Sequence, residues 1–195
     1  MKISSYISTL LLFDFSGLGQ LTEDEKIKEF TRLHDKTVRY QTTVLDSAKY
    51  FMDSCFDIAV QIENDYYLGK ALQLKTRGEF YEGEIDSSII YGNQSLEILK
   101  NYPDSLEYYM AEYNQGNMFL YQEYNIQALV QFKKAAKIID ANFEMYVHVD
   151  RETVMLNRSY CYASIGLVLM NLEDYNGSLE SFNKALKNTY KLDSW

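Results

Sequence analysis

The side chains that most often do chemistry are few in this chain and lie far apart. Its two histidines, His34 and His148, and its two cysteines, Cys55 and Cys161, fall in different segments of the 195 residues. Metal sites and nucleophile–base pairs need such residues at short spacings or on one shared face. A Cys55 nucleophile with His34 as its base is conceivable, but Cys55 sits in a stripe of small and apolar residues, so packing explains it better.

Longer motifs lead to the same expectation. A P-loop, a glycine-rich dinucleotide turn, a nucleophile elbow and a HExxH motif are all absent from the sequence. An acidic group spans a predicted helix end and its turn, and a solvated turn is its simplest interpretation: Glu79, Glu82, Glu84 and Asp86. We therefore expect no catalytic residue, no metal site, no cofactor and no enzymatic activity.

Composition narrows the class of partner. The net charge is −9, the sequence pI is about 4.8, and acidic and basic residues are interspersed. Nucleic-acid binding needs clustered Lys and Arg, so the sequence disfavours a nucleic-acid partner. The 18 tyrosines supply stiff, amphipathic contact area, which suits helix packing and protein surfaces alike. Proteins, peptides and small molecules remain as candidate partners.

Pairs of small residues recur along the chain. The members of each pair are seven residues apart, about two helical turns, and the first members are separated by 40, 40 and 50 residues: Ala48/Cys55, Ser88/Ser95, Ala128/Ala135 and Ser178/Ala185. A glycine precedes each of the last three pairs by 10, 12 and 12 residues, at Gly78, Gly116 and Gly166. Alternating close-approach helices predict an all-α helical solenoid.

Capping and turn residues divide the chain. Thr22 and Glu25 form a capping box, so a helix is expected from about residue 23, with Ile27, Phe30, His34, Val38 and Gln41 inward and a break near Thr42. A second helix is expected over 44–63, with Leu45, Ala48, Met52, Cys55, Ala59 and Ile62 inward. Residues 21–65 would thus be leading helices of a degenerate repeat. Three helix pairs follow, at 66–81 and 85–100, 106–122 and 124–140, and 151–172 and 174–189. Residues 141–149 either extend a flanking helix or form a loop.

These residues resemble the tetratricopeptide repeat family. The last repeat matches its pattern throughout, with Tyr162, Ile165, Gly166, Leu169, Asp174, Tyr175, Ser178, Phe182 and Ala185. The middle repeat matches through Gly116, Phe119, Tyr124, Ala128, Phe132 and Ala135, and the first more weakly through Gly78, Tyr81, Ser88, Ser95 and Leu96. The resemblance implies antiparallel helix-turn-helix repeats, at about 66–100, 104–140 and 150–189, in a right-handed α-solenoid. Less specifically, the chain is similar to sensory regions of bacterial histidine kinases and DNA-binding regulators.

The resemblance also implies a peptide-binding groove. In the family, the first helix of each repeat lines the concave face, through the residues three before, one after and four after the repeat glycine. Here those residues are Lys75, Glu79, Glu82, Tyr113, Asn117, Leu120, Ala163, Leu167 and Met170. Such a groove is charged at its N-terminal end and apolar at its C-terminal end, which suits a peptide with a basic end and an apolar end. The carboxylate-clamp subfamily needs an asparagine where Glu79 stands, so we do not expect that function.

The two ends of the chain leave alternatives open. Residues 1–20 read either as a signal peptide or as an N-terminal capping helix; we favour export to the periplasm over the cytoplasm. No apolar run is long enough to cross a membrane. The last repeat lacks a polar cap, which would permit a homodimer through the C-terminal end. We expect a non-catalytic scaffold that binds a protein or peptide; the alternative is a ligand-sensing input segment of a bacterial regulator.

Overall fold

Every element of the described chain is a helix. The computed structural model describes residues 21–40 and 45–190, without the side chains of 45–47, 148–150 and 190. The helices are α2 (Glu23–Tyr40), α3 (Leu45–Ile62), α4 (Asp65–Glu82), α5 (Ile85–Leu99), α6 (Leu106–Tyr121), α7 (Asn125–Ala141), α8 (Phe143–Asn171) and α9 (Tyr175–Tyr190). The predicted all-α fold is confirmed. The helices form two compact units, one ending at Asn64 and one beginning at Asp65.

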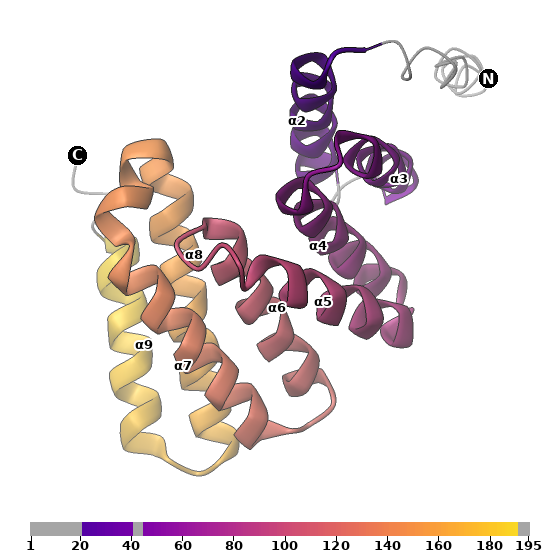
Figure 1. Ribbon diagram of the computed structural model, residues 1–195. Helices are drawn as coiled ribbons and strands as arrows, with labels where there is room; N and C mark the ends of the chain where they lie inside the picture. The colour runs from indigo at the N-terminus through magenta and orange to yellow at the C-terminus, as the bar shows by residue number, and fades with distance from the viewer. Residues whose placement is uncertain (1–20, 41–44, 191–195) are drawn as a thin grey trace, which may run out of the picture. The chain divides into compact units, whose positions relative to one another are not determined.

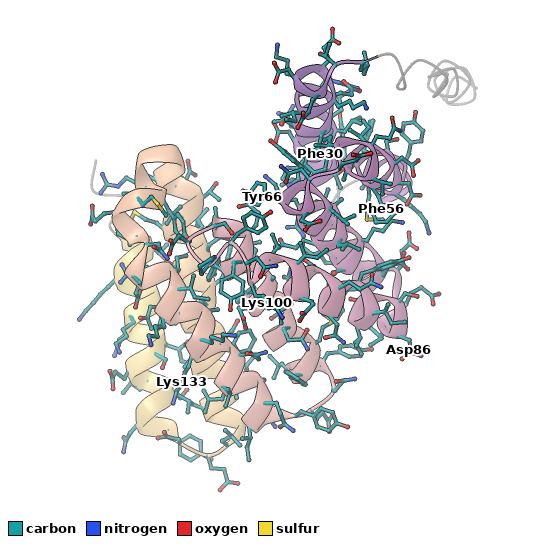
Figure 2. The ribbon with its side chains drawn as sticks, viewed as in Figure 1. Phe30, Phe56, Tyr66, Asp86, Lys100 and Lys133 are labelled. Atoms are coloured by element: carbon teal, nitrogen blue, oxygen red, sulfur yellow. The ribbon has the colours of Figure 1, made fainter. Side chains whose placement is uncertain are left out.

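The first unit pairs α2 with α3. The capping box forms as expected, since the Thr22 backbone amide donates to Glu25 Oε2 at 2.8 Å. Phe30 lies between the two helices and is 1% exposed (Figure 2). Five of the six residues expected inward on the second helix are buried, namely Ala48, Met52, Cys55, Ala59 and Ile62, and the side chain of Leu45 lies outside the described residues.

The inner face predicted for α2 is partly wrong. Leu33 and Thr37 are buried beside Phe30, whereas Val38 is 40% exposed and His34 is half-buried. Thr37 can be buried because its hydroxyl donates to the Leu33 carbonyl at 3.0 Å, which satisfies the polar group. The expected face instead continued from Phe30 at intervals of four residues, through His34 and Val38. Gln41 and the break near Thr42 lie outside the described residues.

The second unit is a row of three antiparallel helix pairs, α4/α5, α6/α7 and α8/α9 (Figure 1). Adjacent pairs also pack on each other, through α5 with α6 and through α7 with α8. Every helix end expected from sequence after residue 65 lies within two residues of the observed one, except the start of α8. The supported description is an all-α helical repeat.

The three pairs close with the same turn. Gly83, Glu123 and Glu173 have positive φ angles of 84°, 62° and 63°. In each turn a backbone amide bonds back five residues, as from Tyr124 to the Phe119 carbonyl at 2.8 Å and from Asp174 to the Leu169 carbonyl at 2.9 Å. This is the hydrogen-bond pattern of a Schellman turn, which ends one helix and reverses the chain into the next.

Two glycines let the paired helices approach closely, as predicted. A Cβ added at Gly116 would lie 2.6 Å from Phe132, and one at Gly166 would lie 3.0 Å from Phe182. In both pairs a glycine on the first helix faces a phenylalanine on the second. The close packing of glycine against phenylalanine stabilises both pairs of helices.

The first pair uses the opposite arrangement, which corrects the assignment of Gly78. Ser88 Oγ donates to the Thr76 carbonyl at 2.7 Å, and Ser178 Oγ donates to the Gly166 carbonyl at 2.8 Å, each across 12 residues. Thr76 therefore occupies the position of Gly166, and the glycine is on the second helix, where a Cβ at Gly92 would lie 3.3 Å from Thr76. Gly78 is the glycine nearest to this position in the sequence, but the first pair carries its contact glycine on the second helix, at Gly92.

Residues 143–149 extend the third pair rather than forming a loop. They make the first turns of α8, a helix of 29 residues. Tyr146 in this extension is buried, and its hydroxyl donates to the Asp104 carbonyl at 3.0 Å. The extra residues of the 50-residue interval thus pack back on the segment that leads into α6.

Candidate functional site

Taking Thr76 in place of Gly78 as the reference residue of the first repeat gives a corrected register. It changes the predicted groove positions on α4 and leaves those on α6 and α8 as they were. Counted from Thr76, the three positions on α4 are Gln73, Arg77 and Phe80 in place of Lys75, Glu79 and Glu82. Lys75 instead extends over the ring of Tyr91 on α5, with its Nζ 5.4 Å from the ring centroid. Glu79 and Glu82 are half-buried near the end of α4.

The predicted residues of α8 share one exposed stripe. Leu167 is 40% exposed and Met170 is 45% exposed, while Ala163 is half-buried. Tyr160, at 57% exposure, continues the same face one turn earlier. Tyr160 was not among the predicted groove residues, because it lies six residues before Gly166 and the family positions begin three residues before that glycine. We call Tyr160, Ala163, Leu167 and Met170 the α8 stripe.

The predicted residues of α6 divide between packing and surface. The Tyr113 hydroxyl lies 3.1 Å from Ser164 Oγ, and its ring is 5.4 Å from that of Phe132. Burial raises the pKa of Tyr113 above its ordinary value. Tyr113 thus joins α6 to α8 within the array. Asn117 and Leu120 are half-buried.

The α4 end of this face is polar. The Gln73 amide donates to the Glu107 carbonyl, and Tyr66 Oη donates to Glu107 Oε2 at 2.6 Å. Lys70 completes this network, with Nζ 2.8 Å from Glu107 Oε1. The Nε atom of Arg77 is buried and has no hydrogen-bond partner among the described residues, and burial lowers the pKa of its guanidinium.

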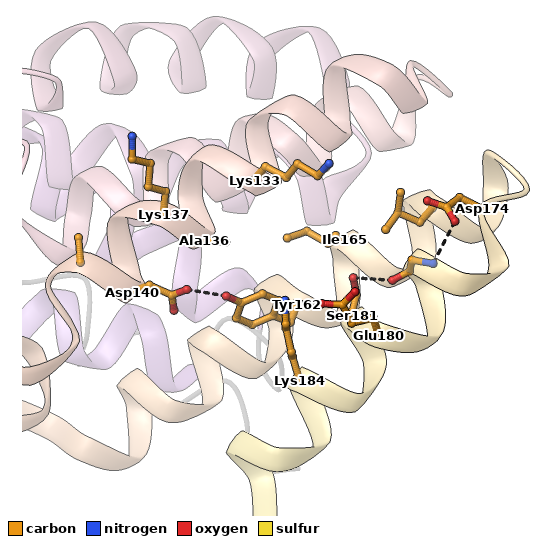
Figure 3. A pocket seen from close by; sticks show the side chains of 13 residues that line it. Lys133, Ala136, Lys137, Asp140, Tyr162, Ile165, Asp174, Glu180, Ser181 and Lys184 are labelled. Carbon is orange, nitrogen blue, oxygen red and sulfur yellow. Dashed lines mark hydrogen bonds and ion pairs between the residues drawn. The ribbon is translucent and has the colours of Figure 1, made fainter.

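A groove that the sequence did not predict lies on the opposite side of α8. It has a volume of about 790 Å³ and runs between α7 and α9 over a floor of α8 (Figure 3). Its lining residues are Lys133, Ala136, Lys137, Asp140, Ala141, Tyr162, Ile165, Leu169, Asp174, Gly177, Glu180, Ser181 and Lys184. We call this the α7–α9 groove. At 100° per residue, Tyr162, Ile165 and Leu169 face away from the α8 stripe.

The acidic side chains of the α7–α9 groove are engaged within the chain. Asp140 accepts from Arg158 Nε at 2.7 Å and from the Tyr162 hydroxyl at 2.5 Å. Burial, together with the bond to Asp140, raises the pKa of Tyr162 to about 12. Asp174 accepts from the Gly177 amide at 3.0 Å.

Among the described residues, one of the three lysines that line the groove is paired and two are not. Lys184 Nζ lies 2.9 Å from Glu180 Oε1, one turn earlier on α9. Lys133 and Lys137 are exposed on α7, and neither forms an ion pair within the described residues. Figure 3 shows both side chains extending from the α7 wall.

The histidines and cysteines occupy structural positions wherever their side chains are described. His34 stacks on Phe30 with ring centroids 6.0 Å apart. Cys55 and Cys161 are buried, and Cys161 Sγ donates to the Phe132 carbonyl at 3.4 Å. Burial raises the pKa of the Cys161 thiol to about 12, opposite to the shift that an activated nucleophile needs. The His148 side chain lies outside the described residues.

The described residues show neither a metal-binding cluster nor a helix suited to cross a membrane. Among 21–40 and 45–190, no group of three or more His, Cys, Asp and Glu side chains is placed to hold a metal ion. No helix of this part of the chain is long and apolar enough to cross a membrane. Residues 1–20, the predicted signal peptide or capping helix, are not among the described residues.

Comparison with known proteins adds little. No protein-family model matches the chain, and no curated protein matches it. Among solved structures, it is similar to BtubC (BKLC) from P. vanneervenii, at 13% identity over 98% of this chain and 88% of that chain, with a TM-score of 0.44. A likeness of this size carries no information on what this chain binds or does.

Proposed function

We propose that this chain is a non-catalytic tetratricopeptide-like module that binds a protein or peptide segment on the face formed by α4, α6 and α8. The observation that carries the proposal is the α8 stripe. It places an aromatic, an aliphatic and a thioether side chain, each 40% or more exposed, on one face of a helix whose opposite face is packed. Exposed apolar side chains at this spacing are anchors for a partner segment.

The groups along the face set the chemistry of the partner. The α8 end is apolar, and the α4 end contains the cationic Arg77 and the network around Glu107. With the corrected register, Arg77 replaces Glu79 at the polar end. The expected partner therefore has apolar side chains at one end and an anionic group at the other, where the uncorrected register favoured a basic end. The buried Nε of Arg77 supports this change of sign, since a desolvated guanidinium gains from a carboxylate.

A selection experiment tests the proposal. Peptides are selected from a random library for binding to the chain, and their dissociation constants are measured by calorimetry. The double variant Leu167→Asp/Met170→Asp should weaken the selected peptides by about a hundredfold or more, since two apolar anchors are lost. The matched control, Val60→Asp/Ile90→Asp, changes one exposed apolar residue of α3 and one of α5 and should alter binding less than about threefold. Equal loss in both variants, or in neither, would contradict the proposal.

A homodimer through α9 is a separate part of the proposal. Leu179 and Leu186 are 62% and 50% exposed, whereas the residues 50 positions earlier, Leu129 and Ala136, pack in the core beside α8. By repeat symmetry this face of α9 accepts another helix, which a second copy of the chain would supply. Light scattering should show a dimer in the wild type and a monomer in Leu179→Asp/Leu186→Asp. A wild-type monomer at high concentration would remove the dimer and leave the peptide-binding proposal standing.

A further inference from the structure

We propose that the α7–α9 groove is a second binding surface, which takes a peptide segment carrying carboxylates next to aliphatic side chains. This proposal does not depend on the α8 stripe, because the two surfaces lie on opposite sides of α8. It rests on the unpaired charge of the groove and on the residues that continue its α7 wall.

The charge of the groove is positive once its internal pairs are removed. Asp140 is held by Arg158 and Tyr162, and Glu180 is held by Lys184. Asp174 caps the first turn of α9 but keeps its negative charge, because its partner is a neutral backbone amide. Lys133 and Lys137 remain without an ion pair among the described residues, so their two positive charges outweigh the one negative charge of Asp174, in a chain whose net charge is −9. An occupant that complements this wall is acidic.

The α7 wall continues past the groove as an aliphatic surface. Ile126 and Val130 are 68% and 61% exposed. With Lys133 and Lys137 they follow the spacing i, i+4, i+7 and i+11, so the four side chains lie on one face of α7. The wall is therefore aliphatic toward the N-terminal end of α7 and cationic toward its middle. The carboxylates of the peptide would therefore lie beside Lys133 and Lys137, and its aliphatic side chains beside Ile126 and Val130.

The size of the groove fits a short segment. Its volume of about 790 Å³ lies within the roughly 300–1,000 Å³ range of ordinary ligand pockets. Its floor at Ile165 and Leu169 is packed, at 5% and 8% exposure, so the occupant lies along the walls rather than penetrating the core. Charged and aliphatic contacts along two helices favour a peptide over a compact metabolite.

The test uses a defined probe. A short fluorescein-labelled peptide with two leucines in one half and two glutamates in the other is titrated with the full chain, and anisotropy is recorded at low and at physiological salt. We expect saturable binding that weakens with salt. The variant Lys133→Glu/Lys137→Glu should weaken binding by about tenfold or more, because each contact becomes a repulsion. Ile126→Ser/Val130→Ser should weaken it less, by about threefold to tenfold.

Four comparisons keep the result specific. The control variant Lys28→Glu/Lys187→Glu makes the same change in net charge at exposed lysines outside the groove and should leave the affinity within about twofold. Equal weakening in this control, or equal binding of a peptide with glutamine in place of glutamate, would overturn the proposal. Loss of binding in Leu167→Asp/Met170→Asp would also overturn it, by placing the peptide on the α8 stripe. Displacement of the peptide by an equal concentration of free glutarate would show a small-anion site instead.

Discussion

Gly116 and Phe132 are in direct contact across α6 and α7. A Cβ at Gly116 would lie 2.6 Å from two atoms of the Phe132 ring, and that ring is 0% exposed. Gly166 and Phe182 repeat the contact with more room, at 3.0 Å. In the first pair, Thr76 and Gly92 exchange the large and the small residue between the two helices. One packing rule, a small residue against a large one, thus joins all three pairs.

Adding a single methyl group at this contact should destabilise the fold. Gly116→Ala forces Phe132 to move in a closed core, at an expected cost of about 1–3 kcal/mol in the free energy of unfolding. The better helix propensity of alanine offsets up to about 1 kcal/mol of this cost. Gly166→Ala should cost less, because its methyl group has more room. Urea unfolding of both variants tests the order, and Gly116→Ala/Phe132→Leu should recover part of the loss. A larger loss for Gly166→Ala would contradict this packing account.

The pair turns offer stabilising substitutions. Glu123 and Glu173 have φ angles of 62° and 63°, a conformation that glutamate adopts at a cost and glycine adopts freely. Glu123→Gly and Glu173→Gly should each raise the free energy of unfolding by about 0.5–1 kcal/mol. Gly83→Ala should lower it by about 1 kcal/mol, although no atom lies within 4 Å of the added Cβ. In thermal melts, Glu123→Gly and Glu173→Gly should therefore raise the melting temperature, and Gly83→Ala should lower it.

Glu112 is a fully buried acidic residue of the second unit. Its side chain is 0% exposed, and Lys134 Nζ lies 2.5 Å from its Oε1. Lys134→Met should destabilise the fold by about 1–3 kcal/mol, because it leaves a buried carboxylate without its cation. The residues 40 positions earlier are the buried Leu72 and the exposed Gln94, so the corresponding positions of the first pair carry no charge. Glu112→Leu/Lys134→Gln should therefore be neutral or stabilising in urea unfolding. A large loss in the double variant would show that the ion pair itself is needed.

Alkaline pH should weaken the second unit through Cys161. Its pKa is raised to about 12 in the folded chain, from an ordinary value of 9.0. Because the folded-state pKa is the higher one, this contribution is fully present below pH 9 and is lost as the pH rises from 9 toward 12. Buried tyrosines add to the same trend, so the informative quantity is the difference between wild type and Cys161→Ala. The variant should lose less stability between pH 8 and 11; equal losses would contradict the assignment.

The helices were predictable where the sequence signal is local. The capping box at Thr22 and the glycine–phenylalanine contacts at Gly116 and Gly166 depend on residues at fixed spacing on one or two adjacent helices. Gly78 misled the sequence argument because the first pair carries its glycine at Gly92, on the other helix. The position of a residue within the repeat is defined by the residue that it packs against, and its own type does not give that position.

The surfaces were harder to predict than the helices. The α7–α9 groove depends on which acids are already paired, and the bond from Tyr162 to Asp140 joins residues 22 positions apart. Val38 and Thr37 show the same limit on a smaller scale, since a local hydrogen bond allowed the polar residue inside. Periodicity indicates which side chains share a face, but it does not indicate what the neighbouring helix contributes.

The most direct measurement is site-specific photocrosslinking of the full chain in its own host. A benzophenone amino acid is placed at Leu167 on the α8 stripe and, in a matched control, at the exposed Ile90 on α5, and the crosslinked products are identified by mass spectrometry. We expect one dominant partner at Leu167, joined through a segment with apolar and acidic residues and absent at Ile90. Crosslinks at Leu167 that are no more specific than those at Ile90 would contradict a binding role for the face formed by α4, α6 and α8.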